Sequence, residues 1–98
     1  MFVSFEKRSA ANAEMESFSI SKEKNVIYTS PVFEDHSYIS WNTCIEKSIN
    51  NTYVVTMQHS RQRRWDEKSF LVIRGVYGNI VFKNSMLRSG KDSHAFAL

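Results

Sequence analysis

Short apolar runs, separated by polar residues, follow one another along the whole chain. Most runs are rich in β-branched or aromatic residues and are too short to carry the apolar stripe of a helix. We therefore predict eight strands, at Phe2–Phe5, Ser17–Ser21, Val26–Thr29, Tyr38–Ile45, Thr52–Met57, Phe70–Arg74, Asn79–Lys83 and Ser93–Leu98.

Turn signals lie between these runs at a spacing of about ten residues, which is typical of β-sandwiches and barrels. Lys22–Asn25 is polar enough for a hairpin turn, and Gly75 and Gly78 bracket a reversal. Pro31 ends the third strand because proline has no backbone donor for a sheet. The pattern predicts an all-β fold, an antiparallel β-sandwich of jelly-roll type with about eight strands.

Ser9–Met15, which contains three alanines, is the best helical segment, and we expect at most a turn or two there. We expect Cys44 to be a buried thiol inside a strand, with pairing to another chain as the alternative. The expected core residues are the following large apolar side chains: Trp41, Phe70, Val72, Ile80 and Phe82.

The composition fits one globular domain, spanning residues 1–98. The chain is 42% hydrophobic and 13% aromatic, which excludes the disordered class. Its net charge of +3 suits an acidic partner surface. This excess is too small to indicate a dedicated nucleic-acid-binding protein.

No run approaches the roughly 20 apolar residues of a membrane helix, so we expect no membrane insertion. Met1–Ser9 carries Glu6, Lys7 and Arg8 in place of the apolar centre of a secretion signal. The single cysteine excludes an internal disulfide. These features favour an intracellular location, with an extracellular one as the alternative if a leader was removed.

Several sequence pieces occur in an order found in a known group of domains. These are Glu16–Ile20 (E-S-F-x-I), Val26–Phe33 (V-I-Y-T-S-P-x-F), Cys44-Ile45, Thr52–Val55, Trp65 with Ser69–Ile73, and Gly78–Phe82. Residues 5–98 resemble the short jelly-roll domains that occur in many copies on protist surface proteins. Those domains are similar in architecture to CUB-like and other carbohydrate-binding sandwiches. The resemblance implies a β-sandwich and a lectin-like or adhesion role.

One segment departs from that family. There, the loop before the tryptophan is rich in Asp and Gly, in the style of D-x-x-G-D-G-W, and can supply oxygen ligands to Ca²⁺. Here, Gln58–Arg64 holds three arginines and no acid before Trp65. The resemblance therefore supports the fold and argues against Ca²⁺-dependent binding, and we predict no metal and no cofactor.

The segment Arg61-Gln62-Arg63-Arg64-Trp65 is the main candidate for partner binding. Arginine presents a planar fork to carboxylates and phosphates and stacks on aromatic rings. An acidic protein tail, a phosphate backbone and an anionic sugar are all suitable ligands. The alternative is a solvated basic loop whose arginine stems cover Trp65. Asp66 and Glu67 reduce the local positive field and weaken the nucleic-acid interpretation.

Tyr77 is the second part of the candidate site, since an aromatic ring at a turn can hold a sugar or anchor a partner. Tyr38 and Trp41 lie near strand ends, and core packing is the alternative for each of these rings. The predicted ligand- or partner-binding residues are Arg61, Arg63, Arg64, Trp65 and Tyr77.

No motif for catalysis is present, so we predict no catalytic residue and no enzyme activity. His36, His59 and His94 are far apart in sequence, and we expect them to be exposed. Glu34-Asp35-His36 is expected to be a solvated loop.

Three functions stay open. The first is a non-enzymatic module that docks on protein partners in a larger assembly or self-associates. The second is a lectin-like module with Trp65 or another aromatic ring exposed beside the arginines. The third is a small ribonucleoprotein subunit whose arginines contact phosphates.

Overall fold

The computed structural model describes residues 1–98 and contains two four-stranded antiparallel sheets. The predicted eight-strand antiparallel sandwich is confirmed. The strands are β1 (Phe2–Ser9), β2 (Glu16–Lys22), β3 (Asn25–Thr29), β4 (Ser37–Cys44), β5 (Thr52–His59), β6 (Phe70–Arg74), β7 (Ile80–Asn84) and β8 (Lys91–Ala97). The single helical turn, η1 (Ala13–Met15), falls within the segment where a turn was expected.

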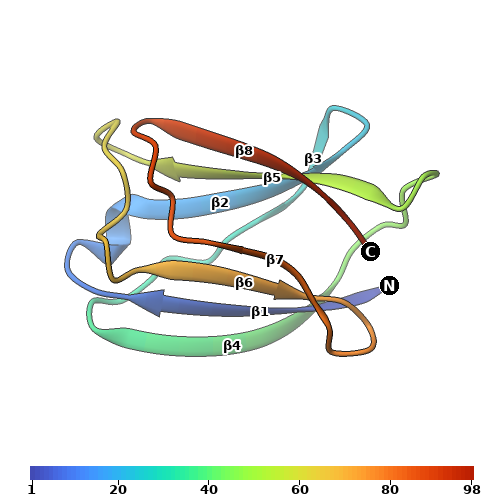
Figure 1. The fold of residues 1–98 in the computed structure, drawn as a ribbon, viewed down its shortest axis with the longest axis horizontal. Coiled ribbons are helices and arrows are strands. Elements are labelled where there is room, and N and C mark those ends of the chain that lie inside the picture. The colour runs from blue at the N-terminus through green and yellow to red at the C-terminus, as the bar shows by residue number, and fades with distance from the viewer.

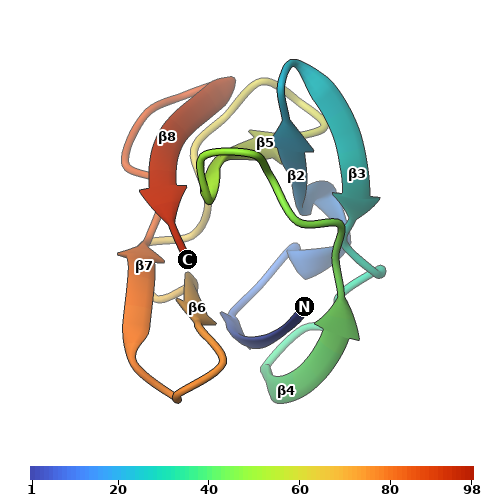
Figure 2. The ribbon, with the colours of Figure 1, turned by 90° about the vertical axis from the view of Figure 1, so that its right-hand side faces the viewer.

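One sheet has the order β4-β1-β6-β7 and the other has the order β3-β2-β5-β8 (Figure 1). Only β2–β3 and β6–β7 are consecutive neighbours within a sheet, so the other connections cross between the sheets. Viewed from one end, β7 and β8 lie on one side, and β3 and β4 lie on the other (Figure 2). The molecule is elongated, with extents of 36 × 24 × 18 Å. The loops at its two ends are therefore far apart.

Alternation along the strands builds the core, because successive side chains of a strand point to opposite faces. In β1, Val3 and Phe5 point inward, and in β2 Phe18 and Ile20 do the same. The core cluster consists of apolar side chains from both sheets and the loops: Val3, Phe5, Ala13, Phe18, Ile20, Phe33, Ile45, Tyr53, Val55, Met57, Trp65, Leu71, Ile73, Met86 and Phe96.

The predicted core was wrong at two positions, Phe70 and Ile80. Phe70 is only partly buried and lies on the outer face of β6, whereas Leu71 and Ile73 point into the core cluster. Val72 is buried as predicted, with 4% of its surface exposed, but it lies outside that cluster. Ile80 is half exposed, since a bulge between Ile73 and Arg74 shifts its pairing. Residues 70–73 of β6 are all apolar, so their sequence does not show which alternate set points inward. The other two predicted core residues, Trp41 and Phe82, are partly buried and pack against the cluster.

The expectation of a buried Cys44 is also wrong, because this side chain is exposed. Cys44 pairs with Phe2 at the end of β4, and both side chains point away from the core. Its Sγ accepts a hydrogen bond of 3.4 Å from the amino group of Met1. No helix of the structure has the length and apolarity needed to cross a membrane.

Candidate partner-binding site

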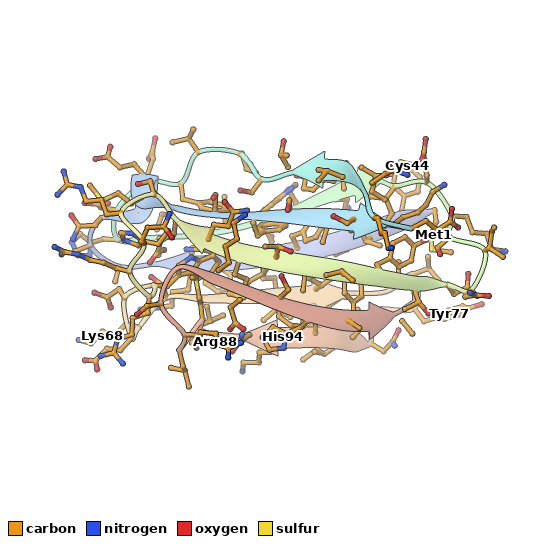
Figure 3. The ribbon with its side chains drawn as sticks, turned by 90° about the horizontal axis from the view of Figure 1, so that it is seen from above. Met1, Cys44, Lys68, Tyr77, Arg88 and His94 are labelled. Carbon is orange, nitrogen blue, oxygen red and sulfur yellow. The ribbon has the colours of Figure 1, made fainter.

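The predicted arginines lie in the connection between β5 and β6, residues 60–69, which we call the arginine loop. This loop is at the end of the sandwich that also carries η1 and the β3–β4 and β7–β8 connections (Figure 1). Figure 3 shows Lys68 of the loop and Arg88 of the β7–β8 connection at this end. We therefore refer to it as the basic end.

Trp65 fixes the centre of the arginine loop. Its side chain is only 1% exposed, and its Nε1 donates a hydrogen bond of 2.8 Å to the Gln58 carbonyl. A buried indole satisfied in this way acts as an anchor for the loop. The open ring that the lectin-like hypothesis expects at this position is therefore absent, which corrects the predicted binding role of Trp65.

A buried ion pair lies beneath the loop. The Lys7 Nζ atom of β1 is 2.7 Å from the Glu16 Oε1 atom of β2, and the two side chains are 0% and 1% exposed. Lys7 Nζ also donates to Ser9 Oγ and to the Arg8 carbonyl, and it lies 4.6 Å from the ring centroids of Phe33 and Trp65. Desolvation lowers the pKa of Lys7, while the hydrogen bond and charge of Glu16 oppose that shift.

Glu16 connects this pair to the loop. Its second carboxylate oxygen, Oε2, accepts a hydrogen bond of 3.0 Å from the backbone N–H of Asp66. Asp66 in turn accepts two hydrogen bonds. Its Oδ1 accepts one from the backbone N–H of Lys68, and its carbonyl accepts one from the backbone N–H of Ser69. The buried charges thus hold the residues that follow the arginines.

The start of the loop is held by backbone hydrogen bonds. Ser60 N donates to the Met15 carbonyl at 2.9 Å, and Gly90 N donates to the Arg63 carbonyl at 3.3 Å. His59 is buried, and its Nδ1 accepts the backbone N–H of Arg61 at 3.1 Å. The expectation that His59 is exposed was wrong. Strand β5 extends as far as His59, and His59 is the last of the alternate β5 residues whose side chains are buried.

Arg61, Arg63 and Arg64 are exposed, and none of their guanidinium groups takes part in an ion pair or a side-chain hydrogen bond. They line a hollow of about 550 Å³ together with Asn12 and Ser89. Its acidic lining residues are Glu16, Asp66 and Glu67. Glu16 already binds Lys7 and the Asp66 amide. The three unpaired guanidinium groups therefore share the hollow with two other carboxylates, those of Asp66 and Glu67.

Tyr77 does not join this site. It lies in the β6–β7 turn, is 94% exposed, and occupies the opposite end of the sandwich with Met1 and Cys44 (Figure 3). The sequence predicted Tyr77 and the arginines as parts of one site, but the fold places them at opposite ends of the molecule. Of the other candidate rings, Tyr38 is exposed, while Trp41 is half-buried and donates through Nε1 to the Tyr28 hydroxyl at 2.7 Å.

Sequence reasoning missed Lys7, Glu16 and Gly90 as supports of the loop. Alternation did carry a signal for the first two, because Lys7 is in phase with Val3 and Phe5, and Glu16 with Phe18 and Ile20. A charged residue in phase with core positions is therefore a candidate for a buried pair. For Gly90 the sequence offers only the segment Ser89-Gly90-Lys91-Asp92, which indicates a turn and no contact with the loop.

The other polar candidates do not line the hollow beside Arg61, Arg63 and Arg64. Asp35 Oδ1 accepts the backbone N–H of Ala13 at 2.8 Å, which makes it a support for the β1–β2 connection. His94 lies beside Asp92 and Asn84 on β8 and β7, and His36 is exposed in the β3–β4 connection. No group of three or more His, Cys, Asp or Glu side chains is arranged to hold a metal.

Comparisons with known protein families, with curated proteins and with solved structures found no match to this chain. The resemblance of residues 5–98 to jelly-roll surface domains stays a prediction.

Proposed function

We propose that this chain is a non-catalytic module that docks, through the arginine loop, on an acidic surface of a partner protein within a larger assembly. The observation that carries the proposal is the presence of three unpaired guanidinium groups on a loop whose backbone is fixed by buried anchors. A fixed loop loses little conformational entropy on binding, so its charges contribute more to affinity. Arginine forks match the geometry of Asp and Glu carboxylates.

The charge pattern of the basic end favours a protein over a nucleic acid. Exposed acids, namely Glu14, Glu34, Asp35 and Glu67, lie at the same end as the arginines. A continuous phosphate backbone would be repelled where it passes them. A protein surface can place opposite charges against both signs, which is how complementary interfaces gain specificity.

The lectin-like alternative has less support at this loop. Trp65 is the only aromatic residue in the lining of the arginine hollow, and it is buried. The most exposed ring, Tyr77, is at the other end of the molecule. A sugar at the arginine loop would therefore lack the ring face on which sugars usually stack.

The direct test is fluorescence anisotropy with a short labelled peptide of alternating Glu and Gly. We expect the wild-type chain to bind it, and R61Q/R63Q/R64Q to bind at least about tenfold more weakly, since each exposed ion pair contributes up to about 1 kcal/mol. K22Q/K24Q/K47Q is the matched control, because it removes three charges near the opposite end. Its affinity should stay within about twofold of wild type.

The other functions are separate outcomes of the same experiment. If a single-stranded RNA binds more tightly than the Glu peptide and shows a log–log salt slope of roughly one unit per contact, the ribonucleoprotein alternative replaces the proposal. Binding of an anionic glycan but not of the peptide supports the lectin-like alternative. Equal losses in the two triple variants would show that only net charge matters, and the proposal would be rejected.

A further inference from the structure

A second, smaller hollow of about 320 Å³ lies at the basic end. It is formed where the end of β1, the start of β4 and the arginine loop meet. Its lining residues are either basic or neutral: Arg8, Ser9, Ala10, His36, Ser37, Tyr38 and Lys68. No carboxylate lines it, which distinguishes it from the hollow beside Arg61, Arg63 and Arg64.

The walls of this hollow are fixed by hydrogen bonds. Ala10 N donates to the buried Ser69 hydroxyl at 3.1 Å, and His36 N donates to the Ala10 carbonyl at 3.0 Å. The Ser37 hydroxyl donates to the Glu34 carbonyl at 2.7 Å. The three connections that bound the hollow are therefore tied together without using the side chains of Arg8, His36 or Lys68.

The positive charges of the hollow are free. Arg8 lies between Tyr38 and Phe70 in the ladder, and neither Arg8 nor Lys68 takes part in an ion pair. The carboxylate two residues from Arg8, Glu6, is already engaged by the Tyr38 hydroxyl at 2.7 Å and by Arg74 Nε at 2.9 Å. The imidazole of His36 adds a third nitrogen donor.

We propose that this hollow binds the phosphoryl group of a phosphorylated serine or threonine in the partner segment that docks on the arginine loop. A phosphomonoester carries about −1.5 to −2 charges and offers three strong acceptor oxygens, which match one guanidinium, one ammonium and one imidazole. Lys68 belongs to the arginine loop and also lines this hollow, so the two surfaces are continuous. This inference rests on the proposed function for the identity of the segment that supplies the phosphate.

A single phosphoryl group fits the hollow better than a nucleic-acid backbone. The hollow is bounded by the β3–β4 connection, where exposed Glu34 and Asp35 precede His36. A chain of phosphates that continued past His36 would meet these carboxylates. One terminal dianion in the hollow avoids them.

The test uses amide chemical shifts of the labelled chain during titration with phosphoserine. We expect saturable shifts confined to Ser9, Ala10, His36, Ser37, Lys68 and Ser69. R8Q/K68Q should weaken binding at least about tenfold, because it removes both permanent charges. Both residues are exposed and unpaired, so the variant should stay folded. K24Q/K47Q removes two charges at the other end and should change affinity less than about twofold.

Other results overturn the inference. Shifts spread over all surface lysines, or an unchanged affinity in R8Q/K68Q, show that no built phosphoryl site exists. Inorganic phosphate that binds more tightly than phosphoserine favours a free anion, and a uridine oligonucleotide that binds these amides more tightly favours nucleic acid.

The unphosphorylated Glu peptide separates this inference from the proposed function. If it binds the arginine loop while phosphoserine fails at the hollow, only the phosphoryl site is rejected. If phosphoserine binds the hollow and the Glu peptide does not bind the loop, only the proposed docking function is rejected.

Discussion

The ammonium of Lys7 and the carboxylate of Glu16 meet 2.7 Å apart inside the sandwich, although they belong to strands of different sheets. Lys7 is further surrounded by Ser9 and the rings of Phe33 and Trp65, while the free oxygen of Glu16 holds the Asp66 amide. The pair therefore connects β1, β2 and the arginine loop at one point. Its role in this account is to position the loop.

Glu16→Gln should destabilise the chain strongly, because it leaves the buried ammonium of Lys7 without a counter-charge. Removing one partner of a buried pair costs about 3–5 kcal/mol. Urea unfolding, followed by circular dichroism, measures the loss. An E16Q chain as stable as wild type would show that the pair does not hold the sheets together.

The double variants K7M/E16Q and K7M/E16L separate stability from loop positioning. Both remove the buried charges and so avoid the unpaired ammonium of E16Q, which should make each more stable than that single variant. Each leaves one neutral polar group without a partner, the new amide NH2 in K7M/E16Q and the Asp66 N–H in K7M/E16L. Gln keeps an oxygen for the Asp66 amide, whereas Leu does not. K7M/E16L should therefore bind the Glu peptide more weakly than K7M/E16Q at similar stability.

Glu6→Gln should reduce the loss of stability in acid. The hydrogen bond from Tyr38, and then that from Arg74, lower the pKa of Glu6 below its ordinary value of 4.5. Because the folded-state pKa is the lower one, the stabilisation from Glu6 is fully present above pH 4.5. It is lost as the pH falls through the folded-state pKa.

The difference in unfolding free energy between wild type and E6Q, measured in urea at several pH values, should shrink as the pH falls below 4.5. We expect a total effect below about 1 kcal/mol, because the pair is partly exposed. E23Q, at the exposed β2–β3 turn, is the control for charge alone. A difference that grows toward low pH would contradict the sign of this linkage.

Gly90→Ala should weaken both the fold and the arginine loop. Gly90 has a φ of +86°, and an added Cβ would lie 3.2 Å from Gln62 Oε1 in that loop. Gly78→Ala is the matched control, because its φ is +80° and nothing lies within 4 Å of an added Cβ. Each variant should lose about 1–2 kcal/mol from backbone strain.

Only G90A should also lower affinity for the Glu peptide, since Gly90 N and the Arg63 carbonyl share a hydrogen bond. Thermal unfolding and fluorescence anisotropy measure the two effects on the same samples. If G78A and G90A lower peptide affinity equally, the contact between Gly90 and the loop is not what positions the arginines.

The alternation of short apolar runs was enough to predict the sandwich and all eight strands. It failed where a strand is apolar on both faces. Residues 70–73 of β6 are all apolar, so their sequence does not show that Leu71 and Ile73 are the residues that point into the core cluster. It also could not show that Tyr77 and Arg63 lie at opposite ends, because that depends on which loops the topology brings together. The arginine segment could be recognised in the sequence because its basic residues separate two runs of β-strand residues.

Trp41→Phe leaves Trp65 as the only tryptophan and tests its burial. We expect the remaining fluorescence to resist quenching by acrylamide, because the Trp65 ring is enclosed by the core and by Lys7. Addition of the Glu peptide should leave this quenching unchanged. Strong quenching that the peptide or a glycan suppresses would show an open ring, as the lectin-like alternative expects.

The most direct test of the central claim is to locate the bound Glu peptide by amide chemical shifts on the wild-type chain. The account predicts shifts in residues 60–68 and in the adjoining Ser89 and Gly90, and none in the β6–β7 turn that carries Tyr77. Shifts concentrated around Tyr77, or scattered over lysines on both ends, would contradict docking through the arginine loop.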